Sequence, residues 1–129
     1  MALPKSCAPL YYTAFVYDGI LGLLLLLVPA TVYSVLAEVP PNHFGYVQFP
    51  AALLLVFAWM FWNTARDVSG NRRMIPYMIA FKLAFALVVI GYWIAGDIPG
   101  LWKPFSIIDL LFAAAFYGSW WRTREPSTT

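Results

Sequence analysis

The stretch Ile75–Ala95 restricts most strongly what this chain can fold into. It reads IPYMIAFKLAFALVVIGYWIA, with Lys82 as its single charged residue. At a rise of about 1.5 Å per residue, a helix of this length crosses the roughly 30 Å hydrocarbon core of a bilayer. The stretch therefore predicts a membrane-spanning helix that carries one charge in its interior.

The composition of the whole chain agrees with a membrane environment. Its 129 residues are 62% hydrophobic and 11% charged, whereas soluble domains are about 45–50% apolar and about 25% charged. We expect one integral membrane domain, 1–129, with the lipid bilayer as its main partner. The net charge is only +2, and no basic patch with interleaved aromatic residues is present, which excludes a nucleic-acid partner.

Four hydrophobic stretches, separated by short loops rich in proline and glycine, predict an all-α, four-helix transmembrane bundle. Pro29 is expected to kink or end the first helix, and Pro50 is placed in the first turn of the second, where its missing N–H costs little. The predicted helices cover residues 10–36, 49–65, 75–95 and 105–121.

The first stretch also has features of a secretory signal peptide. A lysine precedes an apolar run, and Val35-Leu36-Ala37 resembles a cleavage site. The apolar stretch is too long for a signal peptide, however, and further spans follow it. A retained first helix is therefore the prediction.

The distribution of lysine and arginine predicts the orientation. With four spans, the N-terminus, the second loop and the C-terminus share one side of the membrane, and the positive-inside rule makes that side cytoplasmic. The chain is then N-in and C-in, in what we expect to be a bacterial inner membrane. That side carries Lys5, Arg66, Arg72, Arg73, Arg122 and Arg124, whereas the opposite side carries only Lys103.

Ionisable residues inside the predicted spans are the main candidates for a site. Asp18 lies about 12 Å from the cytoplasmic end of the first helix, and Lys82 about 10 Å from the same end of the third. Ala14 and Gly22 share the helix face of Asp18, and such small residues permit close approach of a neighbouring helix. We therefore predict that Asp18 and Lys82 face each other.

Asp109, in the fourth span, is the third ionisable residue and enters from the opposite side. It shares a helix face with Phe112 and Phe116, which suggests a pocket for an apolar ligand that has one polar group. A carboxyl group in such a site also suits acid–base chemistry. The predicted ligand-binding residues are Asp109, Phe112, Phe116, Asp18 and Lys82.

Three interpretations of these charges stay open: a structural ion pair, a path for protons or ions, and a pocket that binds or converts a ligand. The chain has no recognised catalytic signature, so enzymatic activity is left undecided and no particular cofactor is implied. Cys7 and His43 are the only residues of their kinds. They have no partners at metal-ligand spacing, and no metal site is predicted.

The order of these features resembles small bacterial four-helix membrane proteins of the DoxX-like kind. The resemblance is carried by residues 19–24, by Ala65-Arg66-Asp67 with Asn71-Arg72-Arg73, by Lys82, and by residues 109–112. Such proteins tend to have an arginine early in the first helix, where this chain has Tyr17-Asp18. The resemblance implies a four-helix bundle in a bacterial inner membrane, in some cases associated with membrane redox partners.

The leading functional prediction is a non-enzymatic accessory or interaction subunit, because the short loops contain few residues that could form a catalytic site. A protein partner in the membrane or a homo-oligomer would cover its helix faces. The first alternative is a bundle that binds a lipid, a quinone or another small molecule, with enzymatic activity as an option, through Asp109 and the Asp18–Lys82 pair. The second is an oligomeric transporter.

Overall fold

The computed structural model describes residues 7–124 of the chain, and within this range it is helical without a strand. Lys5, which contributes to the predicted orientation, lies outside the described residues. The helices are α1 (Ala8–Leu27), α2 (Pro29–Val35), α3 (Gly45–Arg66), the short 3₁₀ helix η2 (Arg72–Met74), α4 (Ile75–Ala95) and α5 (Trp102–Arg122).

Within residues 7–124, three segments are long and apolar enough to cross a membrane: Ala8–Leu27, Gly45–Arg66 and Arg72–Ala95. This indicates an integral membrane protein. The last helix, α5, has 21 residues, as many as α4, but it is less apolar because it contains Lys103, Asp109 and Arg122.

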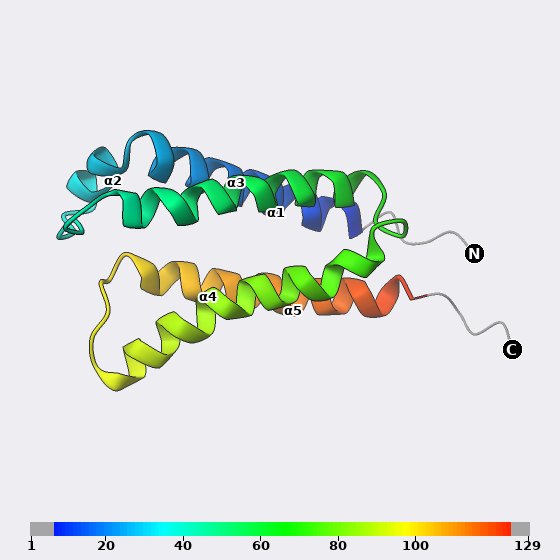
Figure 1. Ribbon diagram of the computed structural model, residues 1–129. Helices are drawn as coiled ribbons and strands as arrows, with labels where there is room; N and C mark the ends of the chain where they lie inside the picture. Colours follow the sequence, from blue (N-terminus) through cyan, green and yellow to red (C-terminus); the bar gives the residue numbers. More distant parts are fainter. Residues whose placement is uncertain (1–6, 125–129) are drawn as a thin grey trace, which may run out of the picture.

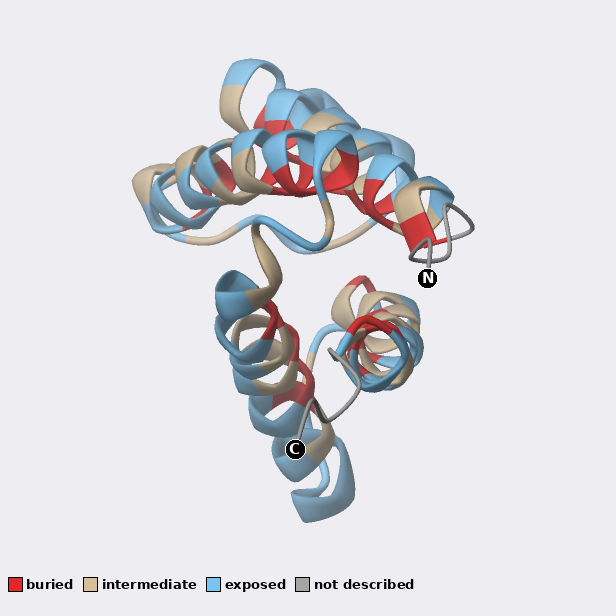
Figure 2. Cartoon of the chain, turned by 90° about the vertical axis from the view of Figure 1, so that its right-hand side faces the viewer, coloured by how far each residue is buried: buried red, intermediate tan, exposed pale blue. Residues whose placement is uncertain are grey.

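The long helices pack as two pairs, α1 against α3 and α4 against α5 (Figure 1). Both ends of the described chain and the α3–α4 connection lie at one end of the molecule, which we name the terminal end. Segments 28–44 and 96–101 lie at the other, named the loop end. Buried residues gather on the sides of the helices that face between the two pairs (Figure 2).

The break after α1 confirms the expected effect of Pro29. The first helix ends at Leu27, Val28 leaves helical geometry with φ −135° and ψ 50°, and α2 starts at Pro29 itself. Proline lacks an N–H group and its ring clashes with the carbonyl four residues earlier, so it begins a helix more readily than it continues one.

The predicted position of Pro50 was wrong. The second long helix starts at Gly45, four residues before the predicted start, so Pro50 lies inside α3 and not in its first turn. At this start the Gly45 N–H donates to Nδ1 of His43, at 2.9 Å. The extra turn was not predicted because Gly45 is a turn signal and Gln48 is polar, which assigned residues 45–48 to the preceding loop. The last helix likewise starts at Trp102 instead of residue 105, whereas α4 has the predicted bounds.

Two apolar clusters fill the space within and between the pairs. The cluster nearer the terminal end contains the buried residues Tyr11, Ala14, Phe61, Ala65, Ile75, Met78 and Phe116. The cluster nearer the loop end contains Leu25, Tyr33, Val47, Ala51 and Leu101. The candidate site starts between these clusters and continues along Leu25, Val47 and Ala51 of the second.

Candidate functional site

Three charged side chains meet where the two helix pairs face each other. Lys82 Nζ of α4 donates to Asp18 Oδ1 of α1 at 2.8 Å and to Asp109 Oδ1 of α5 at 3.2 Å. We name these residues the ion triad. The predicted contact between Asp18 and Lys82 is confirmed, and Asp109 is a second partner of Lys82 that the sequence analysis did not identify.

Small residues allow the helices to bring these groups together. Ala14, Asp18 and Gly22 form one buried face of α1, as the sequence indicated. A Cβ atom added at Gly22 would lie 3.0 Å from the carbonyl oxygen of Ala51 and 3.0 Å from Leu55 Cδ2. Gly22 therefore marks a close approach of α1 to α3, which helps to fix the helix that carries Asp18.

The ion triad is shielded from the surroundings. Asp18 and Lys82 are 0% exposed and Asp109 is 7% exposed. Buried charges are tolerated when they are paired and hydrogen-bonded, and here each carboxylate has a bond to the same ammonium group.

Aromatic rings complete the surroundings of the Lys82 ammonium. Their faces attract a cation, an effect that strengthens when the cation is desolvated. Nζ lies between 5.0 and 5.6 Å from the ring centroids of Phe112, Tyr17, Phe81 and Phe61.

Some polar atoms beside the ion triad remain without partners. Asp18 Oδ2 and the Tyr17 hydroxyl are buried and have no hydrogen-bond partner among the described residues. An unpaired buried polar atom costs about 1–3 kcal/mol. Both atoms belong to residues that line the adjoining cavity, but neither atom is exposed to it, so a side chain must shift before a ligand can bond to them.

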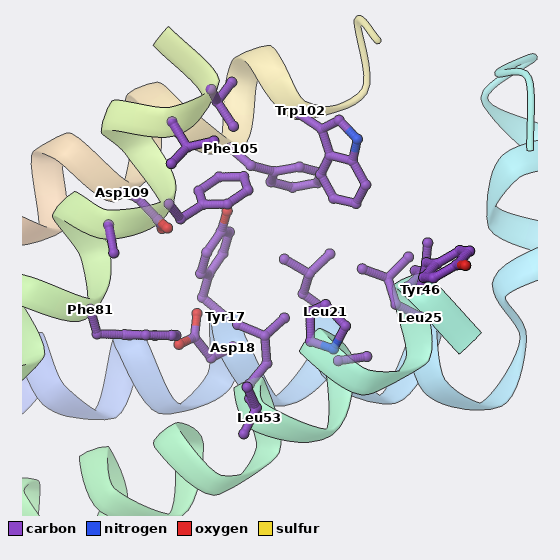
Figure 3. A pocket seen from close by; sticks show the side chains of 18 of the residues that line it. Tyr17, Asp18, Leu21, Leu25, Tyr46, Leu53, Phe81, Trp102, Phe105 and Asp109 are labelled. Atoms are coloured by element: carbon purple, nitrogen blue, oxygen red, sulfur yellow. The ribbon is translucent and has the colours of Figure 1, made fainter. Parts of the chain in front are cut away.

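A cavity of about 420 Å³ adjoins the ion triad and extends toward the loop end (Figure 3). Tyr17, Asp18 and Asp109 lie at one end of it, and Trp102 and Tyr46 lie farther along. Ligand pockets are typically about 300–1,000 Å³, mostly apolar, with a few placed polar groups, and this cavity has those properties. Its lining is Tyr17, Asp18, Leu21, Leu25, Tyr46, Val47, Pro50, Ala51, Leu53, Leu54, Phe81, Ala84, Phe85, Val88, Val89, Ile98, Trp102, Phe105 and Asp109.

The five predicted site residues are placed differently with respect to this cavity. Asp18 and Asp109 line it. Lys82 forms ion pairs with both but is not part of the lining. Phe112 lies beside the Lys82 ammonium. Phe116 is fully buried in the cluster nearer the terminal end. Neither phenylalanine lines the cavity.

None of the aromatic residues that line the cavity was predicted; they are Tyr17, Tyr46, Phe81, Phe85, Trp102 and Phe105. Tyr17 precedes Asp18, and Phe81 precedes Lys82. An aromatic residue directly before Asp18 and before Lys82 was the available signal; Asp109 follows Ile108 and has none. No signal of this kind singles out Trp102, because tryptophan near a helix end is also typical of the membrane interface.

Comparisons of the chain with protein-family models, with curated proteins and with solved structures found no match. The function is therefore inferred from the geometry of the site.

Proposed function

We propose that this protein is a small-molecule-binding membrane bundle, and that its ligand is an apolar or amphipathic molecule held between the two helix pairs. The observation that carries the proposal is the cavity of about 420 Å³ whose walls are apolar and whose one end carries Asp18 and Asp109. The apolar part of the ligand would pack against the apolar walls, and its one polar group would reach the ion triad.

The proposal includes the membrane arrangement. All four long helices span the bilayer, with the terminal end in the cytoplasm and the loop end outside, in a bacterial inner membrane. The support is the bias of lysine and arginine toward the terminal end and the packing of α5 against α4. The DoxX-like resemblance belongs to the same proposal.

The accessory subunit, the homo-oligomer and the oligomeric transporter stay predictions from the sequence. If the buried charges were only structural, we would expect a dry, closely packed interior around them. The cavity beside Asp18 and Asp109 favours binding over that alternative.

The test is purification in a mild detergent from native membranes, followed by mass spectrometry of everything that co-elutes. We expect one small molecule at about one per chain. Leu54→Trp, in the cavity lining, should remove it, whereas the same change at Leu87, which is exposed and outside the lining, should leave it bound.

Two results would contradict binding in this cavity. One is a protein that elutes with a stoichiometric protein partner and no small molecule. The other is a small molecule that Leu54→Trp and Leu87→Trp retain equally. If the ligand is found, Asp109→Asn tests whether its polar group reaches the ion triad.

A further inference from the structure

We infer that the ligand is an amphiphile dissolved in the bilayer and that it enters the cavity sideways, between α3 and α4. This inference depends on the proposed function, since it concerns how the same cavity is filled.

Stacked rings make one of the contacts between α3 and α4. Phe57 of α3 and Phe81 of α4 have centroids 3.6 Å apart and an interplanar angle of 4°. From there toward the loop end the two helices diverge (Figure 1). The stacked pair therefore forms the inner limit of a space between the helices.

Between the stacked pair and the loop end, some residues of α3 and α4 both line the cavity and are exposed at the surface of the molecule. Leu53 and Leu54 of α3 and Ala84 and Val88 of α4 all line the cavity. Nevertheless Leu53 is 41% exposed and Val88 is 59% exposed. We name these four residues the α3–α4 opening.

The depth of the α3–α4 opening determines what lies outside it. Leu53 is about 12 Å along α3 from its start at Gly45, and Val88 is about 10 Å from the end of α4 at Ala95, at 1.5 Å per residue. Both helices are candidate membrane spans. The opening therefore faces hydrocarbon, and molecules that reach it come from the bilayer.

The approaches from the two ends of the molecule are restricted by packed rings. On the terminal side, the buried residues Tyr11, Phe61 and Phe116 pack directly behind the ion triad. At the loop end, Trp102 packs against Phe85 and Phe105, with ring centroids 6.2 and 6.5 Å apart. A water-soluble molecule would have to pass these rings.

The polarity of the cavity indicates which bilayer molecule fits. Its inner end is lined by the carboxylates of Asp18 and Asp109, of which Asp109 is the more exposed. An acyl chain of a phospholipid would place its methyl end against these carboxylates and offer them no hydrogen bond. A small amphiphile that enters with its polar group first would place a hydrogen-bond donor beside Asp109.

The route can be tested by thiol labelling of the full chain in lipid vesicles, without knowing the ligand. Cys7→Ser provides a background without cysteine, and Leu21→Cys places a thiol in the cavity lining. The two reagents are N-phenylmaleimide, which dissolves in the bilayer, and a quaternary-ammonium methanethiosulfonate, which stays in water. Leu87→Cys on the exposed helix face and Asp97→Cys in the loop are the references for the lipid and water phases.

We expect N-phenylmaleimide to label Leu21→Cys and the charged reagent to leave it unlabelled. Adding Ala84→Trp at the α3–α4 opening should slow this labelling about tenfold, the effect of a barrier raised by about 1.4 kcal/mol. Adding Leu87→Trp should leave the rate unchanged. Phe105→Cys, also in the lining, serves as a second target if Leu21→Cys does not fold.

Two outcomes would overturn the lateral route, and they differ in what they say about binding. Labelling of Leu21→Cys by the charged reagent as fast as Asp97→Cys would show entry from water and leave the proposed function standing. Labelling of Leu21→Cys by neither reagent, when N-phenylmaleimide labels Leu87→Cys in the lipid and Leu21→Cys reacts fully after unfolding, would show a sealed interior and contradict both. A phospholipid as the copurifying molecule would overturn the assignment of the ligand as a small amphiphile.

Discussion

At the scale of single residues, Lys82 shows how a charge can be kept in an apolar span. A lysine at the centre of a membrane helix costs about 2.5–3.5 kcal/mol on insertion scales. Here its ammonium has two carboxylate partners and four aromatic rings around it. Removing Lys82 would leave Asp18 and Asp109 buried close together, so the stability of the site depends on this one side chain.

Replacing Lys82 with methionine should destabilise the protein strongly. Breaking a buried ion pair by removing one partner typically costs about 3–5 kcal/mol, because the remaining charge is left uncompensated. The melting temperature of the purified protein, followed by size-exclusion chromatography after heating, should fall well below that of the original chain.

Two further variants make this prediction specific. Lys103→Met, in the half-buried start of α5, should have little effect. Adding Asp18→Asn and Asp109→Asn to Lys82→Met should recover part of the loss, since the uncompensated carboxylates are then gone. A single Lys82→Met variant as stable as the original chain would show that the ion triad contributes nothing to stability.

At the scale of elements, the structure depends on how closely each helix meets its partner. The α1–α3 pair is close because Gly22 has no side chain, whereas α3 and α4 are held apart beyond the stacked rings of Phe57 and Phe81. Close packing in one pair and separation between the pairs together leave the cavity open.

Gly22→Ala should therefore destabilise the α1–α3 pair. Its new methyl group would meet the Ala51 carbonyl oxygen at 3.0 Å, and backbone cannot move aside as readily as a flexible side chain. Overpacking of this kind typically costs about 1–3 kcal/mol. The melting temperature in detergent is the readout.

Gly91→Ala is the matched control for this change. Gly91 lies in α4 with no neighbouring atom within 4 Å of an added Cβ. The substitution should be neutral or slightly stabilising, because alanine is the better helix former. Equal effects of the two substitutions would rule out a close contact at Gly22.

At the scale of the whole molecule, the sequence predicted the helices better than their arrangement. Hydrophobic length and proline position gave the bounds of α4 and the break at Pro29, because both effects act within one segment. The pairing of Asp18 with Lys82 followed from matched depth and small neighbouring residues. Depth is set by rise per residue and needs no tertiary information.

The remaining features depend on side-chain reach and on angles between helices. Asp109 was placed near the opposite membrane surface, and its bond to Lys82 became visible only with both helices in position. The cavity exists because α4 diverges from α3, which no local pattern in either helix encodes. Phe116 was assigned to a pocket since it shares a face with Asp109, but that face continues into the packed core.

The number of membrane crossings determines on which side of the membrane the C-terminus lies. If α5 crosses the bilayer, the C-terminus returns to the side of the α3–α4 connection. If only the three more apolar segments cross, the C-terminus stays with the loop between α4 and α5. The four hydrophobic stretches predict four crossings, and the lysine and arginine bias of the terminal end then predicts both termini in the cytoplasm.

Reporter fusions distinguish these arrangements. A reporter that is active only outside the cytoplasm should be inactive when fused after Thr129 and active when inserted after Gly100, in the loop between α4 and α5. Activity at both positions would mean that α5 does not cross, which would place Asp109 outside a spanning helix and weaken the case for a ligand site within the membrane. Activity only after Thr129 would keep four crossings but invert the orientation, so that the α3–α4 opening would face the cytoplasmic leaflet instead of the outer one.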